Sequence, residues 1–426
     1  MLDTQQAVDA LYGDKTDHLP VRVVLTEASG KALQAKRALA KDAVLVDEPA
    51  QLAYALPDNE HVSSCANCLR CMEAFDPCAL VEDRRATGKW PRPAQSSRVR
   101  CDDCKLQWYC SPLCQKLAAR RFHAAECPRE DATRRAALEA LHAYCRETGE
   151  HAYVGLLRMY AHIVANADRL GGDLEAAQRP FSGLVSDDFV GVTDQALLRD
   201  SKPRALIHAV LGGDAFEAKF PHLAKHATFQ NMLGKISLNS TQIDPASPWF
   251  LYAAELRKIE DTRAKFDAMN VYMEHLGKLS REDVEAQQVH GAAIYFVHPN
   301  INHSCTPNAK VANPHGDHRI VVKATRDIGA GEEITLSYIN EMLPVQERQQ
   351  QLMVQYMFRC ACPRCTTELL EADLGTPLEQ IGAFVSKLSD LHVNENIVAG
   401  AKGHVALVES DESDDDLGDL DDGGDV

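Results

Sequence analysis

The chain has 426 residues, more than one ordinary domain holds, and its 45% hydrophobic and 25% charged residues are typical of soluble globular proteins. This composition excludes a mainly disordered or fibrous protein, and no uncharged apolar run reaches the roughly 18 residues of a membrane helix. The net charge is −17 and ten acidic residues lie between Glu409 and Val426, so even without them the surface lacks the basic footprint of a nucleic-acid binder. The first residues contain no secretion signal. We expect a protein of the nucleus or cytoplasm that contacts neither nucleic acid nor membrane directly.

Short strands and one long helical region are predicted in chain order. Alternating apolar residues predict strands within residues 21–49, with a turn at Ser29-Gly30. Residues 131–269 are predicted to be mainly helical, and an apolar series at helical spacing is expected to form a buried face. This series is Leu256, Ile259, Phe266, Met269 and Met273. The remaining predicted elements are strands at 294–297, 319–324 and 334–337 and a helix at 349–358.

The fourteen cysteines are strongly clustered, which indicates metal binding rather than disulfide bonds in a reducing compartment. The first cluster has the spacing C-x2-C, an insertion, and then C-x2-C-x5-C-x3-C-x8-H-x3-C. Eight ligands make two closed tetrahedral zinc sites, and closed sites are structural. The ligands are Cys65, Cys68, Cys101, Cys104, Cys110, Cys114, His123 and Cys127. Cys71 and Cys78, inside the insertion, are interpreted as thiols that bind no metal.

A second set of motifs lies nearer the C-terminus. The sequence NHSC covers residues 302–305, and GEEITLSY covers residues 331–338. A cluster of three cysteines follows, formed by Cys360, Cys362 and Cys365. Three thiolates cannot close a tetrahedral site by themselves, so a fourth ligand is expected from elsewhere in the chain.

These motifs resemble a known combination of domains. The first cluster is similar to a MYND finger, which includes the Tyr109-Cys110 and Cys114-Gln115 pairs seen here, and NHSC with GEEITLSY resembles the two signature segments of SET-domain protein lysine methyltransferases. The domain order, with a MYND finger after the first SET strands, then a helical insert and then NHSC, resembles that of the SMYD family. The long insertion within the finger and the acidic C-terminal tail resemble the fifth branch of this family. The resemblance implies three zinc ions. Their implied ligands are Cys65, Cys68, Cys110 and Cys114; Cys101, Cys104, His123 and Cys127; and Cys305, Cys360, Cys362 and Cys365.

The resemblance implies an α+β fold, in which a β-rich SET domain is split by a zinc-binding MYND finger and a helical insert and is followed by a post-SET zinc site. The implied parts are an N-terminal extension (1–20), the first SET part (21–64), the finger (65–127, with an insertion at 69–100), the helical insert (128–290), the SET catalytic core (291–340), the post-SET motif (341–366), a short helical segment (367–400) and an acidic disordered tail (401–426).

The resemblance also implies a site for S-adenosylmethionine. Its implied residues are Lys31, Ala32, Leu33, Asn239, Asn302, His303, Tyr338 and Phe358. Tyr338 takes the place of the catalytic tyrosine, and Tyr356 and Tyr295 are candidates for the channel that receives lysine. Ala32 replaces the second glycine of a G-x-G-L segment, where a Cβ would stand close to the ligand. No general base is evident, so we expect desolvation and proton loss to water to neutralise a lysine whose reference pKa is about 10.4.

We therefore expect a protein lysine methyltransferase that acts as a monomer on a histone or another basic protein, such as a ribosomal protein. The alternative is a scaffold that docks peptides through its MYND finger and carries an inactive SET domain, a hypothesis that Ala32 favours. A zinc-dependent DNA binder is disfavoured by the acidic body. Two interpretations of the acidic tail stay open, a solvating tail and a docking arm for basic proteins.

Overall fold

The computed structural model describes residues 4–27, 29–57, 62–72, 98–186, 194–280 and 288–373. Three features discussed above lie outside the described residues: the part of the predicted helical segment 367–400 that follows residue 373, the acidic tail, and Cys78. Within the described ranges, no helix is both long enough and apolar enough to cross a bilayer.

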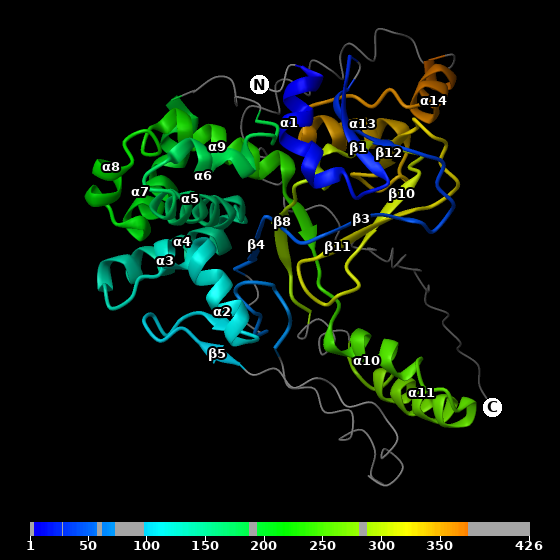
Figure 1. Cartoon of the computed structure of the whole chain (residues 1–426), viewed down its shortest axis with the longest axis horizontal. Helices are drawn as coiled ribbons and strands as arrows, with labels where there is room; N and C mark the ends of the chain where they lie inside the picture. Colours follow the sequence, from blue (N-terminus) through cyan, green and yellow to red (C-terminus); the bar gives the residue numbers. More distant parts are fainter. Residues whose placement is uncertain are drawn as a thin grey trace, which may run out of the picture.

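Three small sheets form the β-rich part of the molecule, on the right of Figure 1. The strand orders are β1-β2-β12-β9, β10-β11-β3 and β4-β8-β7, and every pairing is antiparallel except that of β12 with β9. The strands are β1 (Val21–Thr26), β2 (Gly30–Ala35), β3 (Val44–Glu48), β4 (Leu52–Ala55), β7 (Thr241–Ile243), β8 (Gly291–Ile294), β9 (Asn302–His303), β10 (Ala309–Ala312), β11 (Ile320–Ala324) and β12 (Glu333–Leu336). Each sheet therefore joins early and late parts of the chain.

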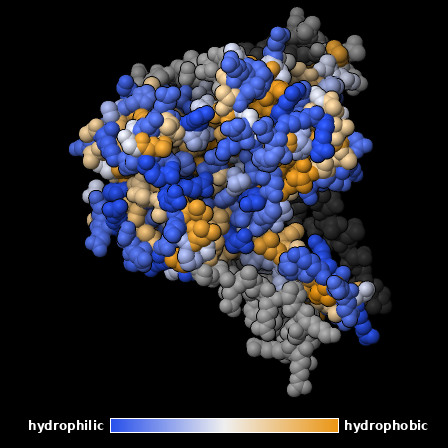
Figure 2. Space-filling view, in the orientation of Figure 1, coloured by the Kyte–Doolittle hydropathy of each residue, from blue (hydrophilic) through white to orange (hydrophobic). Residues whose placement is uncertain are grey.

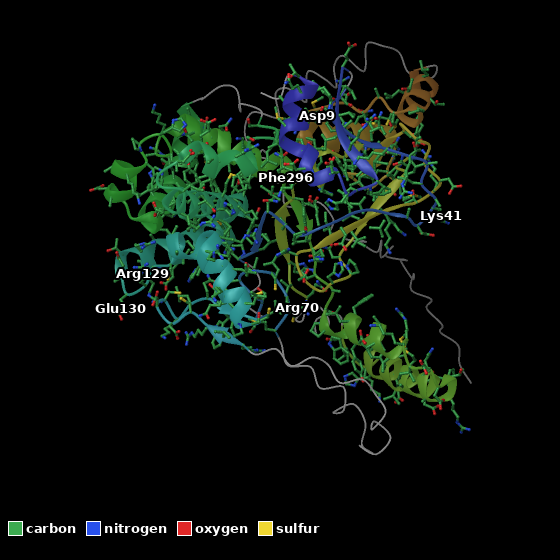
Figure 3. The ribbon with its side chains drawn as sticks, in the orientation of Figure 1. Asp9, Lys41, Arg70, Arg129, Glu130 and Phe296 are labelled. Carbon is green, nitrogen blue, oxygen red and sulfur yellow. The ribbon has the colours of Figure 1, made fainter. Side chains whose placement is uncertain are left out.

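A helix that the sequence prediction missed precedes the first strand. Helix α1 (Gln5–Thr16) starts at Thr4, whose side chain accepts a hydrogen bond from the backbone N–H of Ala7. Val8 and Tyr12, four residues apart, are buried on one face of the helix. The Tyr12 ring lies 4.9 Å from that of Phe296, which Figure 3 shows beside α1. The N-terminal extension is therefore packed on the β-rich part.

The cysteine-rich finger lies beside a bundle of helices. Its elements are β5 (Val99–Arg100), β6 (Trp108–Tyr109), α2 (Pro112–Ala118) and α3 (Ala124–Glu126), with a π-helical turn at Ala119–His123. The bundle consists of α4 (Ala132–Thr148), α5 (Ala152–Arg169), α6 (Leu174–Gln178), α7 (Asp194–Leu211), α8 (Asp214–Lys219) and α9 (His226–Asn239). Helix α5 is buried on nearly all sides. A Cβ at its Gly155 would lie 2.6 Å from the Tyr54 ring of β4, so this glycine allows helix and sheet to meet closely.

The apolar series between Leu256 and Met273 does not form one buried face. The chain breaks between α10 (Pro248–Leu256) and α11 (Thr262–Leu276), which form a hairpin that projects from the body (Figure 1). Leu256 is buried, but Phe266 and Met273 are 65% and 57% exposed, and Figure 2 shows hydrophobic surface on this hairpin. The prediction was right for Leu256, Ile259 and Met269, which belong to a small core around Trp249 and Tyr272, and wrong for Phe266 and Met273, which that core leaves outside.

Two predicted boundaries are displaced by specific contacts. The strand expected at 294–297 ends at Ile294, because the Glu48 carboxylate accepts hydrogen bonds from the backbone N–H groups of Phe296, Val297 and His298 and bends the chain there. The helix expected at 349–358 is α13 (Val345–Tyr356). It starts four residues earlier than expected and ends at Tyr356, because the next residue, Met357, has a left-handed backbone conformation. The last described helix is α14 (Pro363–Asp373).

Candidate functional site

The eight predicted finger ligands form two groups of four. Cys65, Cys68, Cys110 and Cys114 make one group, Cys101, Cys104, His123 and Cys127 make the other, and within each group all ligand atoms lie within 4.8 Å of one another. The Sγ atom of Cys110 lies 3.7 Å from the Sγ atom of Cys68 and 3.5 Å from that of Cys114. Sulfur atoms about 2.3 Å from a tetrahedral zinc ion would be about 3.8 Å apart. Both groups fit zinc, with the interleaved pairing that the resemblance implied.

A buried charge pair supports the histidine of the second group. His123 Nε2 lies 3.3 Å and 3.6 Å from the Sγ atoms of Cys101 and Cys104, while its Nδ1 is 3.6 Å from the Glu126 carboxylate. Arg158 of α5 donates a hydrogen bond of 3.0 Å to Glu126. Burial alone would raise the pKa of Glu126, but Arg158 and His123 hold it below its usual value. A carboxylate on the far side of a metal-binding imidazole orients the ring toward the metal.

Arg158 also ties the finger to the sheet and the bundle. Its Nη1 donates to the carbonyl oxygens of Ala53 in β4 and Ala66 in the finger, at 3.0 Å and 3.1 Å. Its guanidinium stacks 3.8 Å from the centroid of the Phe122 ring. One side chain of the helical bundle therefore contacts both the finger and the first SET part.

The third group of ligands joins the NHSC segment to the last cysteines. The ligand atoms of Cys305, Cys360, Cys362 and Cys365 all lie within 4.8 Å of one another, and the Sγ atoms of Cys305 and Cys365 are 3.4 Å apart. This set fits a third zinc ion, with Cys305 as the fourth ligand that the three-cysteine cluster required.

The predicted cofactor residues of β2 and β9 come together through Asn302. Its side-chain amide donates to the Lys31 carbonyl at 3.0 Å and to the Glu333 carboxylate at 2.8 Å. Lys31 itself points inward: its Nζ donates to the Gly183 carbonyl, and burial lowers its pKa to about 8. Leu33 is fully buried in the core beneath. A half-buried cation at this position suits the carboxylate end of S-adenosylmethionine.

Asn239 approaches the same region from α9. Its side chain accepts a hydrogen bond from Val185 N–H and donates to the carbonyl oxygens of Val185 and Lys235, at 3.2 Å, 2.7 Å and 2.8 Å. Because Lys31 binds Gly183, the segment 183–185 links the two predicted cofactor contacts. In the described conformation Asn239 holds this segment.

Ala32 causes no backbone strain. It is buried in β2, opposite Val24 of β1, and the positive φ angle of this turn belongs to Gly30, at 68°. A Cβ at position 32 therefore stands on ordinary strand backbone. The steric effect of a Cβ close to the cofactor, which favoured an inactive scaffold, is a separate effect and stays a prediction.

Tyr338 stands where three aromatic rings meet. Its ring lies 4.9 Å from Tyr356, 5.3 Å from His303 and 6.4 Å from Phe358, measured between centroids. Its hydroxyl donates to the Ile301 carbonyl at 2.5 Å. Burial raises the pKa of both Tyr338 and Tyr356, so both phenols stay protonated at neutral pH.

His303 connects this cluster to the third zinc group. Its Nδ1 accepts a hydrogen bond from the backbone N–H of Tyr338 at 3.0 Å, which leaves the proton on Nε2, 3.3 Å from the Cys305 Sγ. Burial and the nearby Arg348 charge lower the pKa of His303 to about 4, so the ring is neutral. A neutral ring in this tautomer can donate to a thiolate.

A cleft of about 450 Å³ opens beside Tyr338 and Tyr356. Its walls come from β7 and β10, which are edge strands of their sheets, and from residues near Asp244 and Glu341. Tyr295 does not line this cleft. Its side chain is 1% exposed and its hydroxyl donates to the His318 carbonyl at 2.7 Å, so it packs in the core behind the cleft, contrary to its assignment to the lysine channel.

Some residues that shape the site gave no motif. Glu48 bends the chain before NHSC, and Arg348, with 0% of its side chain exposed, lies beside the third zinc group. In the sequence both are ordinary charged residues. Their buried positions follow only from the packing of distant segments.

Comparison with known proteins agrees with this geometry. The SET domain family matches residues 194–339 and the MYND finger family matches residues 86–127. The chicken protein-lysine N-trimethyltransferase SMYD5 is 24% identical over 375 residues, which cover 84% of this chain and 88% of the relative. The mouse histone-lysine N-methyltransferase SMYD3 is 40% identical over 101 residues (23% of this chain and 22% of the relative). The Arabidopsis thaliana histone-lysine N-methyltransferase ATXR2 is 34% identical over 142 residues (32% and 28%).

Among solved structures, the SET domain of LSMT bound to lysine and AdoHcy matches 84% of this chain and 57% of that chain, with 13% sequence identity and a TM-score of 0.23. The two domain matches, the relatives along most of the chain, and the three groups of zinc ligands point to one conclusion. The chain combines a SET domain with a MYND finger and is similar to proteins of the SMYD family along most of its length.

Proposed function

We propose that this protein transfers methyl groups from S-adenosylmethionine to lysine side chains of basic proteins, with histones and ribosomal proteins as candidate substrates. One observation carries the proposal. Tyr338 lies between the residues that would hold the cofactor and a cleft large enough for a side chain with its flanking backbone.

The residues that would hold the cofactor supply complementary chemistry. When bound, S-adenosylmethionine supplies an activated methyl group, and the protein contributes binding and alignment. The Lys31 ammonium would pair with a carboxylate, the Phe358 ring would pack on adenine, and the backbone of Asn302 and His303 would fix the orientation between them. His303 contacts both Tyr338 and Phe358, with ring centroids at 5.3 Å and 6.1 Å, so these groups are already arranged side by side.

Tyr338 and Tyr356 would prepare the lysine amine. Because both phenols stay protonated at neutral pH, neither can act as the general base. They bound an aromatic, partly buried opening instead, and a lysine amine there loses hydration, which lowers its pKa and favours the neutral nucleophile. The released proton goes to water in the cleft. The Tyr338 hydroxyl, held near the Ile301 carbonyl, would orient the nitrogen for in-line attack.

The cleft favours an extended, basic peptide. Residues of β7 and β10 line it, and open strand edges can pair with a substrate backbone. Asp244 and Glu341 place two carboxylates in its walls, and the net charge of −17 attracts basic proteins over longer range. We further propose that the protein works as a monomer in the nucleus or cytoplasm, and that the finger can dock peptides.

The test is methyl transfer from labelled S-adenosylmethionine into a proteome, followed by identification of the labelled lysines by mass spectrometry. We expect labelled lysines in basic proteins with the wild type and a strong loss of label with Tyr338→Phe. Cofactor binding without any labelled protein would instead support the scaffold alternative. Equal labelling by both proteins would mean that a contaminating enzyme makes the signal.

A further inference from the structure

Arg348 is the most deeply buried charged residue near the third zinc group. None of its side chain is exposed, and its Nη2 lies 3.6 Å from the Cys365 Sγ; the guanidinium also interacts with the Cys305 thiol. Four thiolates around one zinc ion carry a net charge of −2. A buried cation in contact with two of these sulfur atoms partly neutralises that charge at a place that water does not reach.

Two further charged residues extend this contact. Arg348 Nη2 donates to the Glu368 carboxylate at 2.6 Å, and the other oxygen of Glu368 accepts from Arg364 Nε at 2.6 Å. Arg348 and Arg364 therefore share one carboxylate, supplied by α14. The three side chains form a closed ionic network between α13 and α14.

The same two arginines hold the wall of the cleft. Arg348 Nη1 donates to the Leu343 carbonyl at 2.5 Å, and Arg364 Nη1 donates to the Glu341 carbonyl at 2.7 Å. Glu341 lines the cleft beside Tyr338. The segment 341–343 has thus two backbone anchors, both from the network that surrounds the zinc ligands.

Cys305 also contacts His303, and His303 Nδ1 accepts a hydrogen bond from the backbone N–H of Tyr338. The zinc group therefore contacts two residues that reach the site, His303 and Arg348. Through His303 it reaches the tyrosine, and through Arg348 it reaches the cleft wall.

We propose that Arg348, Glu368 and Arg364 are positioning residues that couple retention of the post-SET zinc ion to the shape of the substrate cleft. Arg348 has two roles, because it contacts both the thiolates and the wall. Arg364 has only the second, because it contacts the wall but no sulfur. The activity consequences rest on the proposed function, whereas the zinc and wall consequences do not.

The test compares Arg348→Met, Arg348→Lys and Arg364→Met in the full-length, zinc-loaded protein. Arg359→Met is the matched control, because Arg359 is exposed and adjacent to Cys360 yet outside the network. Zinc content is measured by elemental analysis and zinc release by a chromogenic chelator. Flexibility of the wall is measured by hydrogen exchange of the peptide covering residues 339–345.

For Arg348→Met we expect the post-SET zinc ion to bind about 10- to 100-fold more weakly, the usual effect of removing a group that contacts a metal ligand, and to leave the protein correspondingly faster. The two finger zinc ions should stay, which shows that the protein is folded. Arg348→Lys keeps the positive charge but not the forked guanidinium geometry, so its rate of zinc release should lie between those of the wild type and Arg348→Met. Arg364→Met should keep three zinc ions at the wild-type release rate, yet exchange faster at 339–345 and show a raised KM for protein substrate with little change in kcat.

Wild-type zinc release by Arg348→Met would overturn the proposal, as would unchanged exchange at 339–345 in Arg364→Met. The same would follow if Arg359→Met released zinc as fast as Arg348→Met, since any nearby positive charge would then suffice. If the wild type transfers no methyl group, the proposed function fails, but zinc release and hydrogen exchange still decide on the coupling.

Discussion

Arg158 offers a direct measure of how firmly the finger is fixed to the rest of the protein. Arg158→Met keeps a long apolar side chain but leaves the Glu126 carboxylate, 7% exposed, without its cationic partner at 3.0 Å. It also removes the donors to Ala53 and Ala66 and the contact with the Phe122 ring. Breaking a buried ion pair by removing one partner costs about 3–5 kcal/mol. We expect the free energy of unfolding to fall by this amount.

The measurement is urea denaturation followed by circular dichroism, with zinc release recorded in parallel. Arg169→Met, an exposed change on the same helix, is the control and should stay within about 0.5 kcal/mol of the wild type. Adding Glu126→Gln to Arg158→Met removes the stranded charge and should restore part of the loss. A loss below about 1 kcal/mol in the single variant would refute the view that this pair joins the finger to the body.

Three other predictions follow from the site. Tyr338→Phe should bind cofactor almost normally in a calorimetric titration but turn over about 100-fold more slowly, because the lost hydroxyl acts mainly in the transition state; unchanged turnover would remove Tyr338 from the mechanism. Cys305→Ala should lose one zinc ion and most of the activity, whereas Cys110→Ala should lose a different zinc ion and mainly stability. If both variants lost the same fraction of activity, the assignment of Cys305 to a zinc site beside the active site would be contradicted. Burial lowers the pKa of His298 to about 4, so the folded protein holds this histidine in its neutral form. Because the unfolded chain takes up the proton near pH 6.5, the free energy of unfolding should fall by up to about 3 kcal/mol as the pH drops from 6.5 toward 4. His298→Gln should flatten the thermal stability across this pH range.

Local chemistry explains what the sequence could predict. The zinc ligands were predictable because two or three residues between cysteines fix their geometry, and the three groups in the structure are those expected. The strands β1, β2, β11 and β12 were predictable because their apolar residues alternate or form short runs between turns. Tyr338 could be singled out because GEEITLSY is specific, although its three ring partners come from two other segments.

What the sequence could not predict depends on distant contacts. The apolar residues Phe266 and Met273 have the spacing of a buried helix face, but no other part of the described chain covers them. Tyr295 precedes NHSC directly, yet the bend made by Glu48 and the hydrogen bond to His318 place it behind the cleft. Arg158, Arg348 and Glu126 look like surface residues in the sequence. Their burial follows from the meeting of finger, bundle and sheet.

The post-SET ligands have a further consequence for the unfolded chain. Cys305 and Cys365 are 60 residues apart, so one zinc ion shared between them closes a loop of that length. If this loop is treated like one closed by a disulfide, the closure removes conformational entropy worth about 4 kcal/mol from the unfolded chain. Unlike a disulfide, this crosslink exists only while the thiols are reduced and the metal is present. Oxidation of one ligand would therefore loosen β9, α13 and α14 together, and oxidant exposure should lower the cooperativity of unfolding.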